Sequence, residues 1–397
     1  MNQREIALEI IYKTIGDSSY TNLLMRNKLK ELEPVQRPFV SNLVGGVLKN
    51  YDYLIYQVSD SINNKTSLRN KVILAMAIYE KFYLNKEDYI VLNEYVNLAK
   101  NKFDKSFINA VLHNLKKLKE ADEEYINESL PKWIYNLLKK QYSEEDFKNI
   151  LKNYKRVPTL FYRLNHNKAK FEDFENIEVI NKNIFTSKKN LLNSEAMANG
   201  LFYVQDINSA SLIDNLDLKE DDVLLDMCSA PGSKLFNCLD IVKPENSYSN
   251  ELHEKRLNLI KNKAELLGFE GIHYLNYDGI ELQNVLDLKF DKIILDVPCS
   301  GLGTLSRKPD LKYHIRPESL DELQLIQKDL LISAKNLIKD GGIILYSTCT
   351  LNKKENGKQI EKFLMENERF TLLKEETIIN EDGDCFYYAK LGKGYNR

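Results

Sequence analysis

From about residue 205 onward, short apolar segments alternate with longer segments of helical periodicity, and this alternation constrains the fold more than any other feature of the sequence. The apolar segments are DVLLDM (222–227), NSYSN (246–250), GIHYLN (271–276), KIILDV (292–297) and GGIILYS (341–347). Strands that alternate with helices are typical of a mostly parallel sheet covered by helices. We therefore predict a doubly wound, Rossmann-like α/β domain over residues 205–397.

The N-terminal part has a different period. Apolar residues recur at three- and four-residue intervals in REIALEIIYKTI (4–15), RPFVSNLVGGVLKNYDYLIYQV (37–58) and NKVILAMAIYEKFYL (70–84), which predicts helices. The acidic, polar stretch EADEEYINESLP (120–131) then marks a boundary. We predict an all-α domain over residues 1–125.

A small connecting subdomain is expected between these two, over residues 126–204. It should begin with helix over 132–154 and continue with the short β-rich segments PTLFYRLN (158–165) and IEVI (177–180). Lys and Arg outnumber Asp and Glu by 13 to 8 between residues 131 and 200, although the whole chain carries a net charge of −2. A global positive field is thereby excluded, and any polyanion should meet this basic segment.

The sequence also limits location and metal chemistry. No apolar run approaches the length of a membrane span, and the N-terminus lacks the pattern of a signal peptide. The 5 cysteines include no CxxC pair, so we expect reduced thiols and no metal site. We expect a monomeric, cytoplasmic protein.

The first chemical motif is the turn Cys228–Lys234, which follows the segment ending at Asp226. Gly232 and its small neighbours would let backbone N–H groups at a helix start approach a ligand. The turn is neither GxGxxG nor a Walker phosphate loop. A ligand-binding turn and a plain strand–helix connection both remain open.

Two acidic residues follow the next two predicted strands. Glu251 could accept both hydroxyls of a ribose or lie solvated at a helix start. Asp278 could hold an adenine amino group or cap a turn. Their order along successive strands favours an adenosine-bearing ligand without phosphates.

Two cysteines stand at matching strand ends, which is the second chemical signal. Asp296 and Cys299 follow one predicted strand, and Cys349 follows another, so all three should face the crevice where doubly wound sheets bind ligands. A single buried cysteine is usually only a small apolar residue. A matching pair beside a cofactor-type turn indicates catalysis instead.

Three motifs resemble those of the RNA cytosine-5 methyltransferases: DMCSAPGSK (226–234), DVPCSGLGT (296–304) and STCT (347–350). The N-terminal phrases LVGGVLKN, NEYVNLAK and FINAVLHNL resemble the NusB-like domain of the bacterial 16S rRNA enzymes of the Sun/Fmu type. The resemblance implies 16S rRNA as partner, S-adenosyl-L-methionine as cofactor, and methyl transfer to cytosine C5.

The resemblance also implies roles for individual residues. Cys349 would be the nucleophile that adds to C6, Cys299 would assist release, Asp296 would hydrogen-bond the base, and Lys234 would supply nearby positive charge. The cofactor would contact Cys228, Ser229, Ala230, Pro231, Gly232, Ser233, Lys234, Glu251, Asp278 and Asp296. Independently of the resemblance, the excess of basic residues in the connecting segment predicts that it docks RNA, through residues including Arg156, Arg163, Lys168 and Lys170, together with the N-terminal helical domain.

Two positions depart from the family's pattern. Ser233 stands where glycine is common, which puts cofactor affinity in question, and His113 replaces an arginine of the NusB-like domain. The alternatives are a cytosine-5 methyltransferase that acts on tRNA or 23S rRNA, a DNA enzyme, and a non-catalytic rRNA-binding assembly factor. The presence of both Cys299 and Cys349 argues against the last of these.

Overall fold

The computed structural model describes residues 2–17 and 19–395 and divides the chain into two compact units. The first unit comprises Met1–Lys140 and Lys308–Ile315, and the second comprises Gln141–Arg307 and Arg316–Arg397. Among the helices of the described residues, none combines the length and apolar character needed to cross a membrane.

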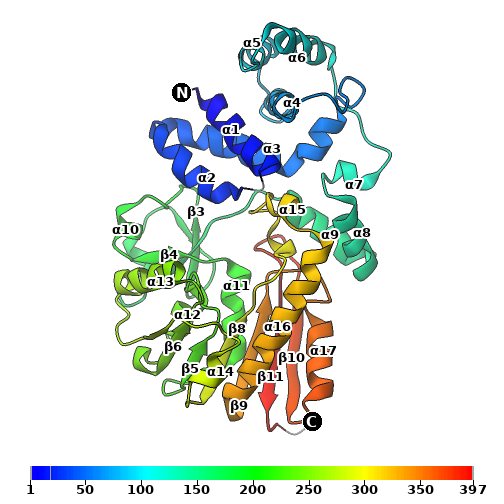
Figure 1. Ribbon diagram of the computed structural model, residues 1–397. Helices are drawn as coiled ribbons and strands as arrows, with labels where there is room; N and C mark the ends of the chain where they lie inside the picture. Colours follow the sequence, from blue (N-terminus) through cyan, green and yellow to red (C-terminus); the bar gives the residue numbers. More distant parts are fainter. Residues whose placement is uncertain (1, 18, 396–397) are drawn as a thin grey trace. The chain divides into compact units, whose positions relative to one another are not determined.

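The first unit is helical, as predicted (Figure 1). Its helices are α1 (Gln3–Gly16), α2 (Thr21–Lys28), α3 (Arg37–Tyr56), α4 (Leu68–Phe82), α5 (Asp88–Asn97), α6 (Lys102–Asn114), α7 (Glu124–Asn127), α8 (Lys132–Gln141) and the inserted α15 (Leu311–His314). Every residue from Val72 to Ile78 in α4 is fully buried, so α4 is the central helix of this unit. Glu80 near its end is also buried and pairs with Arg4 of α1 at 2.8 Å.

The insertion of residues 308–315 into the helical unit was not foreseen, because the sequence places this segment inside the α/β domain. Polar contacts hold it there. Lys312 Nζ donates to the carbonyl of Lys49 at 3.0 Å, the Tyr313 hydroxyl donates to the carbonyl of Leu48 at 2.7 Å, and Thr21 N donates to Asp310 at 3.1 Å. The domain limits at residues 125 and 204 stay predictions.

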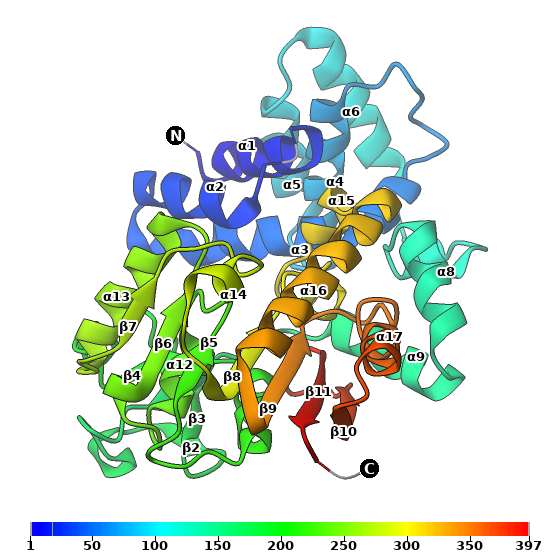
Figure 2. The same ribbon diagram turned by 60° about the horizontal axis from the view of Figure 1, so that its bottom comes forward.

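The second unit contains a seven-stranded sheet of order β10-β11-β9-β8-β5-β6-β7 (Figure 2). Its strands are β5 (Leu224–Asp226), β6 (Ser247–Asn250), β7 (His273–Leu275), β8 (Phe290–Asp296), β9 (Ile338–Thr348), β10 (Phe370–Ile378) and β11 (Phe386–Lys393). The first five are parallel, and β11 pairs antiparallel with both β9 and β10. All five predicted strands are present, so the α/β fold class is confirmed.

Helices cover both faces of this sheet because alternate strand residues point to opposite sides. On β8, Ile294 packs toward α12 (Ser233–Cys238), α13 (Glu254–Leu267) and the short helix η4 (Leu212–Leu216). Ile293 and Leu295 pack toward α14 (Leu282–Val285), α16 (Pro317–Leu337) and α17 (Gly357–Glu366). The strand order reverses between β5 and β8, so ligands are expected at the carboxyl ends of these strands.

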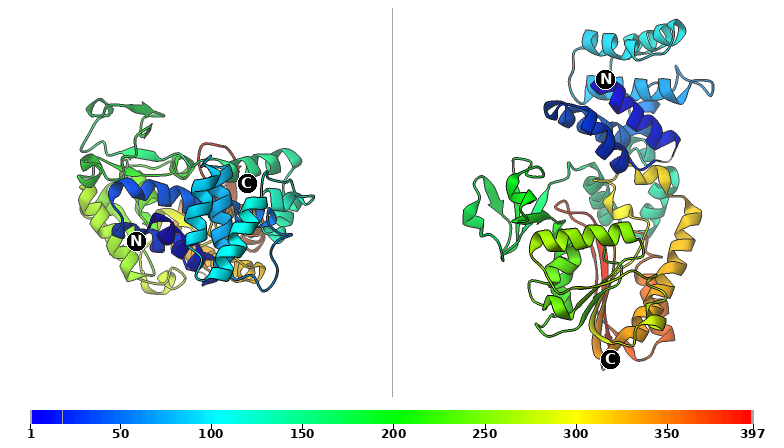
Figure 3. Two further views of the ribbon diagram at one scale, coloured as in Figure 1. Left: turned by 90° about the horizontal axis from the view of Figure 1, so that it is seen from above. Right: turned by 60° about the vertical axis from the view of Figure 1, so that its left-hand side comes forward.

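A separate four-stranded antiparallel sheet belongs to the same unit and lies beside the larger sheet (Figure 3). Its order is β2-β3-β1-β4, with bounds β1 (Phe161–Leu164), β2 (Ile177–Val179), β3 (Ile184–Ser187) and β4 (Phe202–Val204). Helix α9 (Glu144–Lys155) precedes it, and α10 (Glu195–Ala198) and α11 (Ile207–Ser211) flank β4. The sequence indicated β1 and β2. It did not indicate β3 and β4, because both strands are short and the polar segments beside them hide any alternation of apolar and polar residues.

The predicted RNA contacts of this segment need correction. Arg163 in β1 is only 3% exposed and forms an ion pair with Asp240. The Arg156 side chain is 8% exposed and pairs with Asp384 at 3.4 Å. The expectation that these two arginines contact phosphate is wrong, because both guanidinium groups serve buried or half-buried carboxylates. Lys168 and Lys170 are exposed.

Candidate active site

A pocket of about 470 Å³ lies at the carboxyl ends of the parallel strands. It is lined by Met227, Cys228, Ala230, Asn250, Glu251, Leu252, His253, Arg256, Asp278, Gly279, Ile280, Asp296, Val297, Pro298, Cys299, Ile326, Leu330 and Cys349. Its volume is that of an ordinary small-molecule site. The pocket brings together the predicted residues Cys228, Ala230, Glu251, Asp278, Asp296, Cys299 and Cys349. Ser229, Pro231, Gly232, Ser233 and Lys234 do not line it.

The turn from β5 into α12 is fixed by its backbone. Ser229 N donates to the carbonyl of Asn250 at 2.9 Å, which ties the turn to the end of β6. Gly232 has φ +93°, and a Cβ there would lie 2.7 Å from the Phe236 ring. Only glycine fits this position. Ser233 is the first residue of α12, and its carbonyl accepts a hydrogen bond from Gln205 at 3.1 Å.

Glu251 and Asp278 face the pocket from the ends of β6 and β7. Glu251 is 4% exposed, and its Oε1 accepts from His253 N at 3.1 Å and lies 3.3 Å from Arg256. Asp278 is exposed and accepts from Ile280 N at 3.0 Å. A buried carboxylate that opens onto a pocket can still accept hydroxyl groups from a ligand.

Asn250 is a pocket residue that the sequence reasoning missed. Its Nδ2 donates to the carbonyls of Met227 and Tyr277 at 3.0 and 3.1 Å, and its Oδ1 accepts from Tyr277 N at 3.1 Å. One amide thus joins the loops that follow β5, β6 and β7. Its position directly before Glu251 was the only available signal, and the segment NSYSN carries no chemistry of its own.

Asp296, which lines the pocket, forms an ion pair with the buried Lys234. The Lys234 ammonium donates to Asp296 Oδ2 at 2.6 Å, and the Ser347 hydroxyl donates to Asp296 Oδ1 at 2.7 Å. Burial alone would lower the pKa of Lys234, but the Asp296 carboxylate outweighs burial and raises the pKa above its ordinary value. Lys234 therefore stays charged, and the pair offers one donor and one acceptor side by side.

Cys299 and Cys349 meet across the ends of β8 and β9, with their sulfur atoms 3.4 Å apart. The hydrogen bond to Cys349, followed by burial, raises the pKa of Cys299 well above its ordinary value. Cys299 is thus held as a neutral thiol. Burial also raises the pKa of Cys228, the third cysteine in the pocket. All five cysteines are free of disulfide bonds.

The loop that carries Cys349 is held by the short helix η6 (Leu302–Thr304). Gly303 N donates to the carbonyl of Cys349 at 2.9 Å, and Cys385 N donates to the carbonyl of Gly303 at 2.9 Å. A Cβ at Gly303 would lie 2.2 Å from the Cys385 carbonyl oxygen and 2.9 Å from that of Cys349. Glycine at 303 therefore permits the close packing that positions the reactive loop.

Asp226 is a second residue whose importance the sequence left open. It ends β5 with 1% exposure, and neither carboxylate oxygen has a hydrogen-bond partner among residues 2–17 and 19–395. Burial, and next to it the charge of Asp296, raises the pKa of Asp226 to about 7. In the described part of the chain, no cluster of three or more His, Cys, Asp or Glu is arranged to hold a metal ion.

Comparison with known proteins places this pocket in a family. Residues 213–391 match the family described as 16S rRNA methyltransferase RsmB/F, and residues 1–117 match the NusB family. "Probable ribosomal RNA small subunit methyltransferase B" of Bacillus subtilis (strain 168) is 31% identical over 397 residues, covering 92% of this chain and 89% of that protein. The chain belongs to the 16S rRNA methyltransferase RsmB/F family. The resemblance drawn from both halves of the sequence is confirmed, and the chain is a methyltransferase of the small-subunit rRNA type.

Solved structures agree on the fold of this RsmB/F-type chain. The crystal structure of PH0851 has a TM-score of 0.79 at 20% identity and covers 99% of both chains. The structure of NSun6 from Pyrococcus horikoshii with SFG has a TM-score of 0.60 at 18% identity and covers 68% of this chain and 100% of that one. At such identities the likeness is one of fold.

Proposed function

We propose that this methyltransferase transfers a methyl group from S-adenosyl-L-methionine to C5 of a specific cytosine in 16S rRNA, through a covalent bond between Cys349 and C6. The observation that carries the proposal is the 3.4 Å approach of two strand-end thiols, of which Cys299 is held neutral. Two thiols at this distance allow one to form the bond to C6 while the other lies beside that bond as it breaks.

The pocket fits the cofactor. Its volume of about 470 Å³ suits a nucleoside-sized ligand, and Glu251 and Asp278 offer acceptors to a ribose and an amino group. Ala230 and the turn around Gly232 would leave backbone groups near the methionine part. When bound, S-adenosyl-L-methionine supplies a methyl group on a positively charged sulfur, which is a strong electrophile but not strong enough for an unactivated cytosine C5.

The Lys234–Asp296 pair supplies the activation. Cytosine presents an amino donor at N4 and acceptors at N3 and O2. Asp296 accepts from the amino group and Lys234 donates to a ring acceptor, so electron density is drawn to that edge as the thiolate of Cys349 adds to C6. The carbon C5 then takes the methyl group. The C5 proton then passes to solvent, its electron pair re-forms the C5–C6 double bond, and the Cys349 thiolate leaves C6, with Cys299 beside the breaking bond.

The test is methylation of defined RNA by purified protein. Small-subunit rRNA, large-subunit rRNA and tRNA from cells that lack the gene are incubated separately with the cofactor, and new 5-methylcytosine is mapped by bisulfite sequencing. We expect one 16S cytosine to become resistant to conversion, and none with Cys349→Ala. Methylation confined to tRNA or 23S rRNA, or at an atom other than C5, would overturn the proposal.

A further inference from the structure

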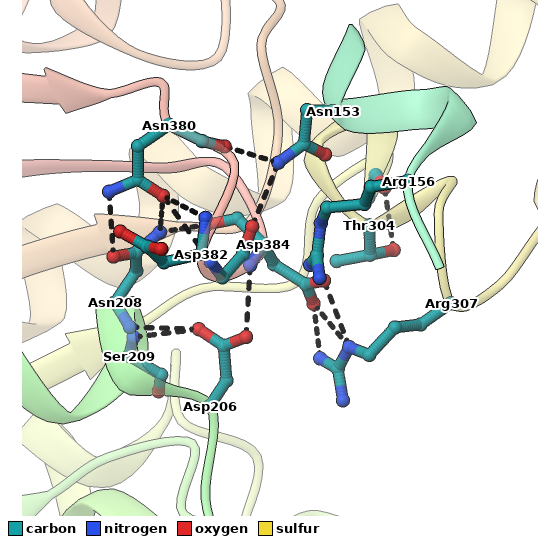
Figure 4. A network of polar contacts seen from close by, with 12 residues as sticks. Asn153, Arg156, Asp206, Asn208, Ser209, Thr304, Arg307, Asn380, Asp382 and Asp384 are labelled. Carbon is teal, nitrogen blue, oxygen red and sulfur yellow. Dashed lines mark hydrogen bonds and ion pairs between the residues drawn. The ribbon is translucent and has the colours of Figure 1, made fainter. Parts of the chain in front are cut away.

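Arg307 and Arg156 converge on one buried carboxylate, Asp384, outside the pocket (Figure 4). Arg307 Nε donates to both oxygens of Asp384 at 2.9 Å, and its Nη2 also donates to Oδ2. Arg156 Nη2 lies 3.4 Å from Oδ1. Asp384 is 0% exposed, so its buried negative charge requires one cation as a partner. It has two, Arg307 and Arg156.

The segment that carries Asp384 is fixed from several sides (Figure 4). Asp384 N donates to Asp206 Oδ2 at 2.9 Å. Asn153 Nδ2 donates to the carbonyls of Asn380 and Gly383 at 2.6 and 2.8 Å. The carboxylate therefore cannot swing away, and the guanidinium of Arg307 is held in one orientation before any ligand arrives.

Only one edge of the Arg307 guanidinium is used. Among residues 2–17 and 19–395, Nη1 of Arg307 makes no hydrogen bond, and the side chain is 35% exposed. The Arg156 side chain is 8% exposed, so Arg156 by itself could neutralise Asp384 in a purely structural ion pair. Burial and the neighbouring Asp384 raise the pKa of Asp206, the second carboxyl of the cluster.

Arg307 is also close to the nucleophile along the fold. Its backbone N donates to the carbonyl of Thr304 in η6, and Gly303 of η6 donates to the carbonyl of Cys349. Burial alone would lower the pKa of Arg307, but Asp384, Asp206 and Cys349 raise it. The cation thus stays charged and lies within electrostatic reach of the reacting thiol.

We propose that Arg307 binds a phosphate group of the RNA strand next to the target cytosine; this inference rests on the proposed function. A guanidinium with one edge fixed on a carboxylate and the other edge free is preorganised for a phosphate. Arg156 and Arg163 are buried and cannot bind an RNA phosphate. A nucleotide whose base is flipped into the pocket requires the phosphates beside it to be held.

The test uses a 16S oligoribonucleotide that the wild-type enzyme methylates at C5. Single phosphates flanking the target are replaced one at a time by uncharged methylphosphonates, and kcat/KM is measured with wild type, Arg307→Gln and Arg307→Lys. Arg369→Gln is the matched control, because Arg369 also pairs with an aspartate, Asp340 at 2.7 Å, but is 66% exposed. Cofactor affinity is measured by calorimetry for every variant.

We expect one methylphosphonate to lower wild-type kcat/KM by about tenfold or more, as the loss of a charge-assisted hydrogen bond should. Arg307→Gln should show the same loss on the natural strand and no further loss with that methylphosphonate, while Arg369→Gln behaves as wild type. The slope of log affinity against log salt should fall by about 0.7 in Arg307→Gln. If Arg307→Gln lost cofactor binding, the same comparison of natural and methylphosphonate strands would be made with Arg307→Lys.

Additive losses at every linkage would overturn the proposal. A second result would also overturn it. If Arg307→Gln changed the pH dependence of Cys349 alkylation in the absence of RNA, while its methylphosphonate effects stayed as in wild type, Arg307 would act on the thiol and not on a phosphate. If the wild type methylated no RNA at C5, the proposed function itself would fail. That result differs from the one in which the RNA is methylated but the losses caused by Arg307→Gln and by the methylphosphonates add up.

Discussion

Cys299 and Cys349 hold their sulfur atoms 3.4 Å apart at the ends of the neighbouring strands β8 and β9. The parallel register sets this distance, because Asp296 pairs with Ser347 in the sheet and each cysteine follows a few residues later. The hydrogen bond to Cys349, followed by burial, raises the pKa of Cys299 well above its ordinary value and keeps it a neutral thiol.

The two cysteines should therefore fail in different ways when removed. Cys349→Ala should abolish both methylation and any protein–RNA adduct, because the thiolate that adds to C6 is missing. Cys299→Ala should permit the addition but slow the elimination, so a covalent complex with substrate RNA should accumulate. Denaturing electrophoresis with labelled RNA measures both. Cys238→Ala, at a buried cysteine on α12, is the control. An adduct seen only with Cys349→Ala would reverse the roles.

The Lys234–Asp296 pair should affect turnover more than binding of the cofactor. Lys234→Met removes the cation that is paired with Asp296 and that we propose donates to the base, and kcat should fall by roughly 10²–10³, the size expected for one preorganised donor. Cofactor affinity should change little. Lys339→Met is the matched control, because Lys339 on β9 pairs at 2.7 Å with Asp291, which lies at the opposite end of β8 from Asp296. Equal losses of kcat in both variants would assign the effect to stability rather than to chemistry.

Glu251 tests the cofactor end of the pocket. Glu251→Ala should weaken S-adenosyl-L-methionine binding by tenfold or more, because a buried charge-assisted hydrogen bond contributes roughly 1.5–3 kcal/mol. Calorimetry measures the affinity directly. Glu254→Ala, on an exposed glutamate at the start of α13, should bind as wild type. Unchanged affinity in Glu251→Ala would remove this residue from the site.

The candidate reactive residues that follow the strands could be predicted from the sequence, because the carboxyl ends of parallel strands lie at one edge of the sheet. Asp296, Cys299 and Cys349 reach the pocket for this reason. The fold class followed from the two hydrophobic periods in the same way. Neither inference required knowledge of a long-range contact.

Partners of charged residues could not be predicted. Arg163 carries the same charge as Lys168, yet its ion pair with Asp240 spans 77 residues of sequence and removes it from solvent. The same holds for Lys312, whose hydrogen bonds to Lys49 and Ser129 draw residues 308–315 into the helical unit. The side-chain amide of Asn250 joins the end of β6 to the loops after β5 and β7, and such a role leaves no local pattern in the sequence.

Asp226 should make stability depend on pH. Burial, followed by the charge of Asp296, raises the pKa of Asp226 to about 7 in the folded protein, whereas an unfolded aspartate titrates near ~3.9. The folded state therefore favours the protonated acid. This favourable contribution is complete below about pH 4 and is lost as pH rises to about 7, at roughly 1.4 kcal/mol per unit of pKa difference as an upper limit.

Asp226→Asn should abolish this dependence, since the amide keeps the shape but has no proton to lose. Thermal unfolding should show the variant to be more stable than wild type at pH 8 and close to it at pH 4. Asp291→Asn is a control of opposite sign: burial alone would raise the pKa of Asp291, but its bonds with Lys339 and Val223 lower it, so this variant should lose stability at pH 8. A constant difference in Tm between wild type and Asp226→Asn from pH 4 to pH 8 would contradict this prediction, because Asp226 would then not titrate in that range.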